Sequence, residues 1–421
     1  MRRVVLAALG SYGDLHPILG VALALKAKGA DVTVASHPDY AAKVEASGLD
    51  FRPCGPSFDQ LQLDTGLTPA AVIERIARDQ AFLFSGFVNA TLDAWIRDVT
   101  PAIADADVVV GTSLACGADI VARTLKKPFV TAALSPAILL SAADPPKWPG
   151  APLVLKPKGA LARGLNRTVL ALGKRKMAKA MSGVRNAYRR AGLTSGAGVS
   201  GVVSDHLTLA LYSPLLMKPQ SDNPPNTQIV GFPFYDSEDG QTARLDPKLD
   251  AFLAAGPPPV VFSLGSVVVH DGEAFYRTAI ATAAALKQRC VVLCGPDSPL
   301  LGVDFGPDVY VAAYAPHSLV FPRALAIVHH GGIGSTGQAL RAGKPQLVTP
   351  VFADQFDNGW RCSLLGAAKT LNYKDWTLDK ATRALKAVLE SPVMAERARE
   401  VASEIAQENG AEKAAGLILG V

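Results

Sequence analysis

The chain has 421 residues, of which 49% are hydrophobic and 19% charged. This composition can form buried cores and is too apolar for a protein that is disordered throughout. The length is sufficient for two or three domains. Its formal net charge is +5, but the excess is local. Residues 147–190, the basic segment, hold twelve Lys and Arg and no Asp or Glu, which leaves 30 basic residues for 37 acidic ones elsewhere, so only this segment suggests an anionic partner.

Short β-type runs alternate with helical patterns in the first half of the chain. The predicted strands are Val4–Leu9, Asp31–Ser36, Val108–Thr112 and Phe129–Leu134, and the predicted helices are Pro17–Lys28, Pro38–Ser47 and Ala115–Leu125. Strands and helices in tandem imply a parallel sheet wrapped by helices.

The second half repeats this plan. Its predicted strands are Val260–Gly265, Val291–Gly295, Val309–Tyr314, Ala326–His330 and Gln346–Val351. We therefore expect an α/β protein with two facing Rossmann-like domains and a ligand cleft between them, because ligands of parallel sheets bind beyond the carboxyl ends of the strands.

Composition sets the expected domain boundaries. Pro, Asn and charged residues replace apolar periodicity between the two halves, as is typical of a linker. We predict an N-terminal domain over residues 1–220, a linker region over 221–258, a C-terminal domain over 259–395 and a terminal helix over 396–421 that could pack back on the first domain.

The loop after the first predicted strand is Gly-Ser-Tyr-Gly-Asp-Leu-His-Pro, residues 10–17. It has G-x-x-G in place of G-x-G-x-x-G, and the second strand leads to His37 without an acidic residue, so dinucleotide binding is disfavoured. Asp14 and His16 could each take a proton at this position. Alternatively, Asp14 caps the helix that follows.

A glycine-rich turn between a strand and a helix, residues 326–337, is the strongest motif. Gly331, Gly332 and Gly334 would let backbone N–H groups approach an anion at the helix N-terminus, as in a diphosphate site, unless they serve only helix–strand packing. Further hydrogen-bond donors are expected from His330, Ser335, Thr336 and, after the strand that begins the second half, Ser266.

Two further motifs end predicted strands. Tyr314, in the sequence Tyr-Ala-Pro-His that ends at His317, could present an aromatic face to a nucleobase, although a tyrosine at a strand end is commonly a packing residue. Asp354 and Gln355 combine a carboxylate with an amide, which suits the hydroxyls of a sugar. A solvated surface pair is the alternative.

Taken in order, these motifs resemble the nucleotide-sugar signature of the family-1 glycosyltransferases. The matching residues are 314–317, 329–336, Gly-Lys-Pro at 343–345, and 354–355. The resemblance implies the GT-B fold. The turn at residues 10–17 looks most like bacterial rhamnosyltransferases, sterol glucosyltransferases and glycopeptide glycosyltransferases. Asp14 stands where plant and macrolide members have their catalytic His, so the resemblance implies Asp14 as the catalytic base, with His16 nearby.

The resemblance also implies a donor site and a reaction. The reaction would be inverting transfer of a hexose from UDP-glucose or a dTDP-sugar to a hydroxyl, without a metal or cofactor. Gln338 replaces the plant-type Glu that grips the ribose, which leaves UDP versus dTDP open. Asp105-Ala-Asp107 precedes a strand, so we interpret it as a surface turn and not as a metal site. The implied donor-binding residues are Gly13, Ser266, Tyr314, His317, His330, Gly332, Gly334, Ser335, Thr336, Gln338, Asp354 and Gln355.

Aromatic and apolar side chains of the first half suggest a hydrophobic small-molecule or lipid acceptor, with Phe82, Phe87, Leu134 and Trp148 as candidates, although such residues are more often plain core. The basic segment would dock to anionic lipid headgroups or form a solvated helix face, and no nucleic-acid partner is expected. A nucleotide-sugar 2-epimerase or hydrolase of the same fold and a non-catalytic lipid- or sugar-binding protein remain alternatives.

Features of the chain also bear on its compartment. Five cysteines without a Cys-x-x-C pair indicate a reduced, cytoplasmic protein rather than a disulfide framework or a zinc site. The first apolar run stops after six residues, so we interpret it as a strand and not as a signal peptide. Residues 129–143 form the longest apolar stretch, which polar residues interrupt, and we expect no membrane span but a possible peripheral contact with the inner face of the membrane.

Overall fold

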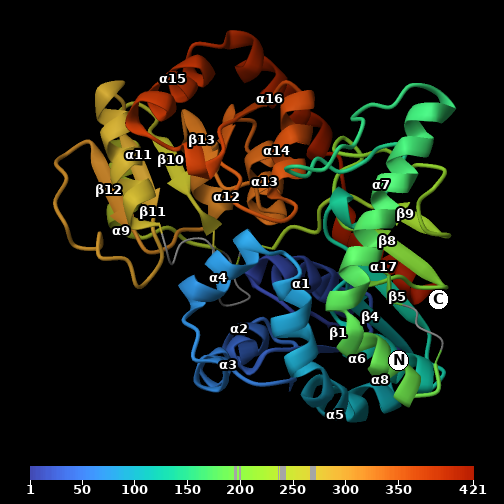
Figure 1. Ribbon diagram of the computed structural model, residues 1–421. Coiled ribbons are helices and arrows are strands. Elements are labelled where there is room, and N and C mark those ends of the chain that lie inside the picture. Colours follow the sequence, from blue (N-terminus) through green and yellow to red (C-terminus); the bar gives the residue numbers. More distant parts are fainter. Residues whose placement is uncertain (194–196, 199–200, 236, 238–242, 266–271) are drawn as a thin grey trace. The chain divides into compact units, whose positions relative to one another are not determined.

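The computed structural model describes residues 1–193, 197–198, 201–235, 237, 243–265 and 272–421. It divides into two compact units, drawn in Figure 1: unit 1 comprises Met1–Gln241 and Glu408–Val421, and unit 2 comprises Thr242–Gln407. Each unit contains one parallel sheet with helices on it, so the predicted α/β class and the two Rossmann-like domains are confirmed.

Unit 1 is built on a seven-stranded sheet in which every neighbouring pair is parallel. The central strands are buried throughout, as expected of a sheet covered on both faces. In spatial order the strands are β3 (Asp50–Pro53), β2 (Asp31–Ser36), β1 (Arg3–Ala7), β4 (Val108–Thr112), β5 (Phe129–Ala133), β8 (Leu207–Ala210) and β9 (Thr227–Ile229).

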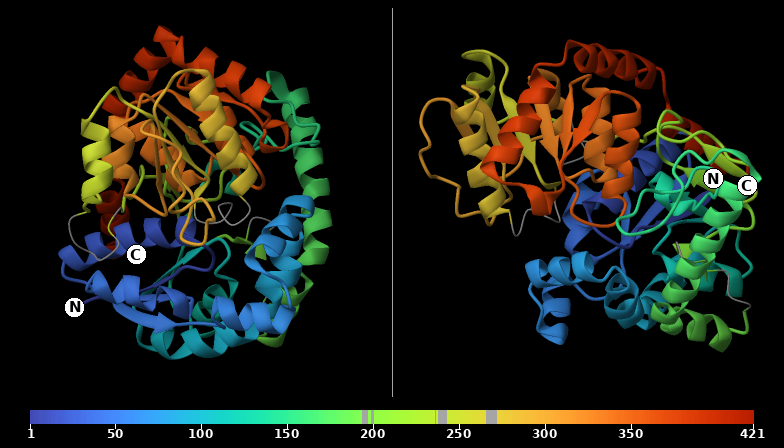
Figure 2. Two further views of the ribbon diagram at one scale, coloured as in Figure 1. Left: turned by 90° about the vertical axis from the view of Figure 1, so that its left-hand side faces the viewer. Right: turned by 45° about the horizontal axis from the view of Figure 1, so that its top comes forward.

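The helices of unit 1 cover this sheet (Figures 1 and 2). A π-helical turn, Leu83–Val88, leads into α5, and a short antiparallel hairpin pairs β6 (Ala197–Gly198) with β7 (Gly201–Val202). The described helices are α1 (Tyr12–Ala27), α2 (Ala41–Ala46), α3 (Phe58–Thr65), α4 (Pro69–Arg78), α5 (Asn89–Asp105), α6 (Cys116–Thr124), α7 (Gly159–Ala180), α8 (Ser182–Arg190) and α17 (Gly410–Leu419), with 3-10 turns at Pro38–Tyr40 and Pro136–Ile138.

The first helix begins five residues earlier than predicted. The sequence favoured a start at Pro17, because proline suits the first turn of a helix. In the structure Ser11 is the N-cap of α1, and Pro17 lies inside the helix. The prediction was wrong because the capping box formed by Ser11 and Asp14 fixes the start and outweighs the proline.

Unit 2 is built on a six-stranded parallel sheet. Its strands, in spatial order, are β12 (Val309–Ala312), β11 (Cys290–Leu293), β10 (Val260–Ser263), β13 (Ala326–His329), β14 (Gln346–Val348) and β15 (Ala368–Thr370). In chain order this is 3-2-1-4-5-6, the order of a doubly wound nucleotide-binding sheet. Its switch point lies between β10 and β13, so a ligand site is expected in the loops after these two strands.

Side chains of successive strand residues enter two different cores of unit 2. Val260 and Phe262 pack in a core with Tyr276 of α11, whereas Val261 packs with Leu253 of α9. This alternation follows from the two-residue period of a strand and shows that both faces are covered. The described helices are α9 (Pro247–Ala254), α11 (Glu273–Ala285), α12 (His317–Val320), α13 (Ile333–Arg341), α14 (Gln355–Leu364), α15 (Leu378–Leu389) and α16 (Pro392–Ile405), with 3-10 turns at Phe321–Arg323 and Tyr373–Asp375.

The division into units differs from the predicted boundaries in two places. The predicted linker, 221–258, is shared: β9 pairs with β8 in unit 1, and α9 packs in the core of unit 2. The predicted terminal helix, 396–421, is also shared, because α16 belongs to unit 2 and α17 packs against α1 in unit 1. In the described part of the chain, no helix has both the length and the apolar character needed to cross a membrane.

A substitution at Gly20 tests how closely the chain at Pro233 packs on α1. A Cβ at Gly20 would lie 2.6 Å from the carbonyl oxygen of Pro233, whereas one at the exposed Gly173 of α7 would meet open space. We expect Gly20→Ala to lower the free energy of unfolding by about 1–3 kcal/mol through overpacking, and Gly173→Ala to raise it by about 0.5–1 kcal/mol through helix propensity. Urea titrations of both variants check this; equal effects would contradict it.

Candidate functional site

Unit 2 holds a histidine between two glycine turns at the switch point of its sheet. Gly265 follows β10 with a φ of +69°, and His330 follows β13. A Cβ at either Gly265 or Gly332 would overlap the His330 imidazole. Glycine at both positions therefore leaves room for the ring, which is only 8% exposed.

His330 is a neutral group at physiological pH. Burial, with smaller contributions from His329 and His317, lowers its pKa from the usual 6.5 to about 3. Its Nδ1 is buried and has no hydrogen-bond partner among the described residues. A buried polar nitrogen of this kind is expected to find a partner in a bound ligand or water.

The helix that follows offers backbone N–H groups to an anion. Gly332 is the N-cap of α13, and no side chain in the described part of the chain caps this terminus. A Cβ at Gly334 would meet open space, so the first turn is accessible on that side. The free N–H groups and the helix dipole favour an anion here, and the buried Ser335 and Thr336 add hydroxyl groups.

His329 fixes the turn through a network that the sequence analysis missed. Its Nδ1 accepts a hydrogen bond from the Gly331 N–H at 3.2 Å, so its Nε2 carries the proton and donates to Gln346 Oε1 at 3.0 Å. Burial lowers the pKa of His329 to about 4, which keeps Nδ1 free to accept. A glutamine in a fully buried strand is the sequence signal for this network.

Asn358 joins the glycine turn to the predicted sugar-binding pair and was also missed. Its Nδ2 donates to the Gly331 carbonyl and to Asp354 Oδ2, both at 2.9 Å. Gln355 Oε1 accepts from the backbone N–H groups of Val351 and Phe352 at 2.8 and 3.2 Å. Part of the polar capacity of Asp354 and Gln355 is therefore used to hold their own loop.

The remaining donor candidates lie near the same strand ends. Tyr314 follows β12 and is 43% exposed. His317 Nε2 lies 3.4 Å from Ser263 Oγ at the end of β10, and its ring stacks on Phe321. Gln338 is buried on α13. Ser266 lies outside the described residues.

In unit 1, Asp14 lies in the first turn of α1, shortly after β1. Its Oδ2 accepts a hydrogen bond from the Ser11 N–H at 2.9 Å, while Ser11 Oγ accepts from the Gly13 N–H at 3.1 Å. Gly10 has a φ of +139°, and a Cβ there would overlap the Asp14 carboxylate. Asp14 therefore takes part in capping, but as the third residue of a capping box whose N-cap is Ser11 and not as the predicted cap itself; Gly13 contributes its backbone N–H.

His16 and Asp14 are two residues apart on α1, and side chains at this spacing point to different sides of a helix. The His16 ring packs against Tyr12 and Tyr235 at centroid distances of 5.3 and 5.4 Å. The Asp14 carboxylate is close to Tyr40, whose hydroxyl donates to the Gly10 carbonyl at 3.0 Å. Burial and the charge of Asp14 raise the pKa of Tyr40.

Next to this turn, aromatic rings surround the buried His37 at the end of β2. Their centroids lie 4.9–6.3 Å from the imidazole. His37 Nδ1 lies 3.2 Å from the Pro56 carbonyl and donates to it, which leaves Nε2 as an acceptor without a partner among the described residues. Trp95 Nε1, a donor, is likewise without one. The rings are those of Tyr40, Phe58, Phe87 and Trp95.

The four acceptor candidates occupy different surroundings in unit 1. Phe87 belongs to the His37 cluster, and Phe82 lies 4.5 Å beneath the guanidinium of Arg75 on α4. Leu134 is buried directly after β5, and Trp148 is half-buried in the loop before α7.

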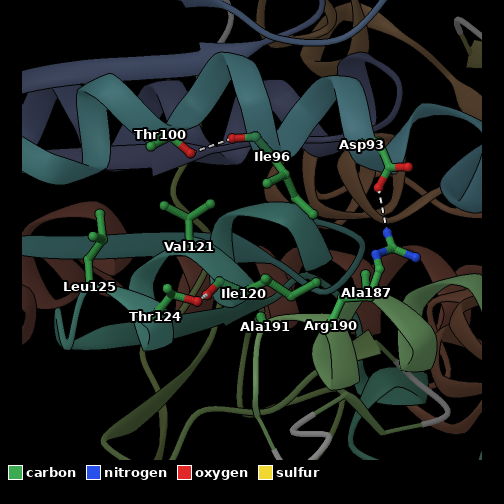
Figure 3. Close-up of a pocket in the computed structure, with 10 residues that line it drawn as sticks. All are labelled: Asp93, Ile96, Thr100, Ile120, Val121, Thr124, Leu125, Ala187, Arg190 and Ala191. Atoms are coloured by element: carbon green, nitrogen blue, oxygen red, sulfur yellow. Dashed lines mark hydrogen bonds and ion pairs between the residues drawn. The ribbon is translucent and has the colours of Figure 1, made fainter.

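A cavity of unit 1 lies among α5, α6 and α8 (Figure 3), and none of the predicted site residues lines it. Its volume is about 340 Å³. The hydroxyls of Thr100 and Thr124 donate to carbonyls of their own helices, and Asp93 pairs with Arg190 at 2.8 Å. Its polar groups are thus satisfied, and we do not assign it the chemistry of the strand ends.

The acidic pair Asp105 and Asp107 lies away from these strand ends. Asp107 Oδ2 accepts from the Arg3 N–H at 2.8 Å, at the amino ends of β1 and β4. Ligands of parallel sheets bind at the opposite edge.

Comparisons with known proteins agree with this geometry. The profile of a family described as "Erythromycin biosynthesis protein CIII-like, C-terminal domain" matches residues 279–418. Over 434 residues, the chain is 27% identical to sterol 3-beta-glucosyltransferase of Aspergillus oryzae. The chain is therefore similar to glycosyltransferases of family 1, and it shares the GT-B fold with solved glycosyltransferases. The resemblance expected from the motifs is thereby confirmed.

The relatives differ in how much of their length is matched. The alignment with the Aspergillus oryzae protein covers 98% of this chain but 30% of that protein. O-mycaminosyltylonolide 6-deoxyallosyltransferase of Streptomyces fradiae is 34% identical over 209 residues, 49% of this chain and 48% of that protein. The chain thus spans about three-tenths of the length of the sterol glucosyltransferases.

Solved structures share the fold over the whole chain. The glycosyltransferase of kitacinnamycin superposes with a TM-score of 0.72 at 23% identity and covers 100% of this chain and 98% of its own. Glycosyltransferase VinC, solved in complex with dTDP, gives 0.69 at 20% identity and covers 99% and 98%.

The buried histidines of unit 2 predict a loss of stability in acid. In the unfolded chain an imidazole takes up a proton near pH 6.5, but His329 does so only near pH 4 when folded. The unfolded state thus binds more protons between these values, and the free energy of unfolding falls as the pH falls, by up to about 1.4 kcal/mol per pH unit for each such histidine.

We expect His329→Gln to reduce this pH slope by about one proton. Urea titrations from pH 7 to pH 4.5 measure it, with His206→Gln, at an exposed position in unit 1, as the control. An unchanged slope in His329→Gln would contradict the assignment.

Proposed function

We propose that the protein transfers a hexose from a nucleoside-diphosphate sugar, UDP-glucose or a dTDP-sugar, to a hydroxyl of a hydrophobic small-molecule or lipid acceptor, with inversion at the anomeric carbon. The observation that carries the proposal is the neutral His330 between Gly265 and Gly332 at the uncapped N-terminus of α13.

The chemistry of the α13 turn suits a departing diphosphate. Negative charge that builds on the leaving group would meet backbone N–H groups, the positive end of the helix dipole and the hydroxyl of Ser335. The unpartnered Nδ1 of His330 offers a further polar contact. In this proposal these groups stabilise the leaving group, and no metal or other cofactor is needed.

Asp14 is the proposed base. Its carboxylate is held by the Ser11 N–H beside Gly10, so it is oriented before a substrate arrives. In the proposed reaction the acceptor hydroxyl gives its proton to Asp14 while its oxygen attacks the anomeric carbon and the nucleoside diphosphate leaves. His16 packs with aromatic rings and is proposed to shape this site.

The acceptor class rests on the His37 cluster and on the relatives. The cluster combines aromatic faces with an unpaired acceptor, His37 Nε2, and an unpaired donor, Trp95 Nε1, within the described residues. A hydroxyl can satisfy both, since it donates and accepts. The names of the relatives specify a sterol and a tylonolide, which are hydrophobic molecules that carry hydroxyls.

Asp14→Asn tests the base. The amide oxygen can still accept from the Ser11 N–H, so the cap is kept while basicity is lost. We expect kcat to fall by about 10²–10⁴-fold with an unchanged Kd for the nucleotide. Transfer from UDP-glucose and dTDP-rhamnose to sterol, macrolide and phenolic acceptors is followed by product analysis.

Undiminished transfer in Asp14→Asn would refute the role of Asp14. An epimerised sugar in place of a glycoside would indicate an epimerase, and acceptor-independent release of free sugar a hydrolase. Thermal protection by nucleotides without turnover would indicate a non-catalytic binding protein.

Gly334→Ala tests the donor site. The added methyl group meets open space and a better helix former replaces glycine, so the protein without ligand should be at least as stable as the wild type. If the diphosphate lies against this turn, the methyl group intrudes on it, and we expect the Kd for UDP or dTDP to rise about tenfold, or about 1.4 kcal/mol. Calorimetric titration measures this; an unchanged Kd would place the nucleotide elsewhere.

A further inference from the structure

The long helix α7 of the basic segment is held at two points and is exposed between them. In its first half, Asn166 is fully buried and bonds the backbone of Val154 and Ala142 at 2.8–3.1 Å. At its end, the Ala180 carbonyl accepts from Asn89 Nδ2 at 2.8 Å. Residues 171–176 between these anchors are all exposed. Figures 1 and 2 show α7 as one unbroken helix.

Three leucines of α7 are exposed, at 91% for Leu161, 49% for Leu165 and 58% for Leu172. They are spaced four and seven residues apart, and Leu161 and Leu172 are close to three whole turns of 3.6 residues apart, so the three form one stripe along the helix. Singly exposed leucines are common on protein surfaces, but three that are aligned on one face of a helix require a reason.

Cations continue the same stripe. Arg175, Lys176 and Lys179 are fourteen, fifteen and eighteen residues after Leu161, which again is close to whole turns. The cations of α7 are all exposed, it has no acidic residue, and none of its six cations has an ion-pair partner within the described residues. The six are Arg163, Arg167, Lys174, Arg175, Lys176 and Lys179.

We propose that this face of α7, defined by Leu161, Leu165, Leu172, Arg175, Lys176 and Lys179, docks on the surface of a bilayer that contains anionic lipids. The leucines would enter the boundary between headgroups and acyl chains, and the cations would pair with lipid phosphates, as in helices that lie in a membrane interface. The phosphates of a nucleic acid would also bind the cations, but a nucleic acid would not explain the exposed leucines. The proposal does not depend on the proposed reaction.

Vesicle sedimentation with the full chain tests the proposal. We expect binding to vesicles of phosphatidylcholine with 30% phosphatidylglycerol, weak binding to phosphatidylcholine alone, and weaker binding at higher salt. Replacing Arg175, Lys176 and Lys179 by Gln should weaken binding by about a hundredfold, since each basic residue near an anionic membrane contributes about fivefold.

The matched control removes three exposed lysines of unit 2 by Lys248→Gln, Lys369→Gln and Lys374→Gln. Both triple variants lower the formal net charge from +5 by the same three units, so a difference between them isolates the face of α7. Equal weakening in both would overturn the proposal in favour of a general charge effect.

A second triple variant, Leu161→Gln, Leu165→Gln and Leu172→Gln, tests the apolar part and keeps helix propensity. It should weaken vesicle binding and make the remainder more sensitive to salt, whereas the control Leu63→Gln, Leu364→Gln and Leu378→Gln, at exposed leucines elsewhere, should bind like the wild type. Thermal unfolding confirms that each variant is folded. Wild-type binding by the α7 leucine variant, or equally tight binding of a DNA duplex, would refute the membrane assignment.

Discussion

The packing of the His330 imidazole between Gly265 and Gly332 is the constraint on which the rest of the unit 2 site depends. A side chain on either glycine would displace the ring. Because the ring is buried it stays neutral, and it fills the space between Gly265, after β10, and Gly332, at the N-terminus of α13. The geometry offered to an anion is therefore built into the packing before any ligand arrives.

A chain of hydrogen bonds behind the turn supports this packing. Gln346 fixes the tautomer of His329, His329 accepts from the Gly331 N–H, and Asn358 holds the Gly331 carbonyl. The N–H and the carbonyl of Gly331 are thus both hydrogen-bonded to buried side chains. The N–H groups of the first turn of α13 are then the ones that remain for an anion in the proposed donor site.

Much of the fold was predictable because its strands carry strong local signals. β2 and β4 were predicted to the residue. β10 to β14 of unit 2 were found, but their predicted ends lie up to three residues too late, since the apolar character continues into loops such as that after Gln346–Val348. The strands β3, β8, β9 and β15 were missed, because their sequences lack a long apolar run and it is pairing within the sheet that makes them strands.

The candidate site residues also differ in how far the sequence predicts them. The spacing of the glycines in the turn after His330 is enough to predict that turn, because a side chain at Gly332 would overlap the His330 ring. Gln346 and Asn358 could not, because their roles depend on partners that are far away in sequence and close only in the folded sheet. Asp14 is intermediate: its cap follows from local sequence, whereas its role as base rests on the family resemblance.

The candidate diphosphate site and the proposed lipid-binding face of α7 would bind anions in different ways. The candidate diphosphate site is formed by a neutral imidazole, hydroxyls and backbone N–H groups, which act at short range and with fixed direction. The formal positive excess of the chain lies instead in the basic segment, where α7 carries six of the twelve basic residues on flexible, exposed side chains. Flexible cations suit a fluid surface of many phosphates better than one oriented leaving group. A surplus of charge and the recognition of a charged substrate are therefore independent features of this sequence.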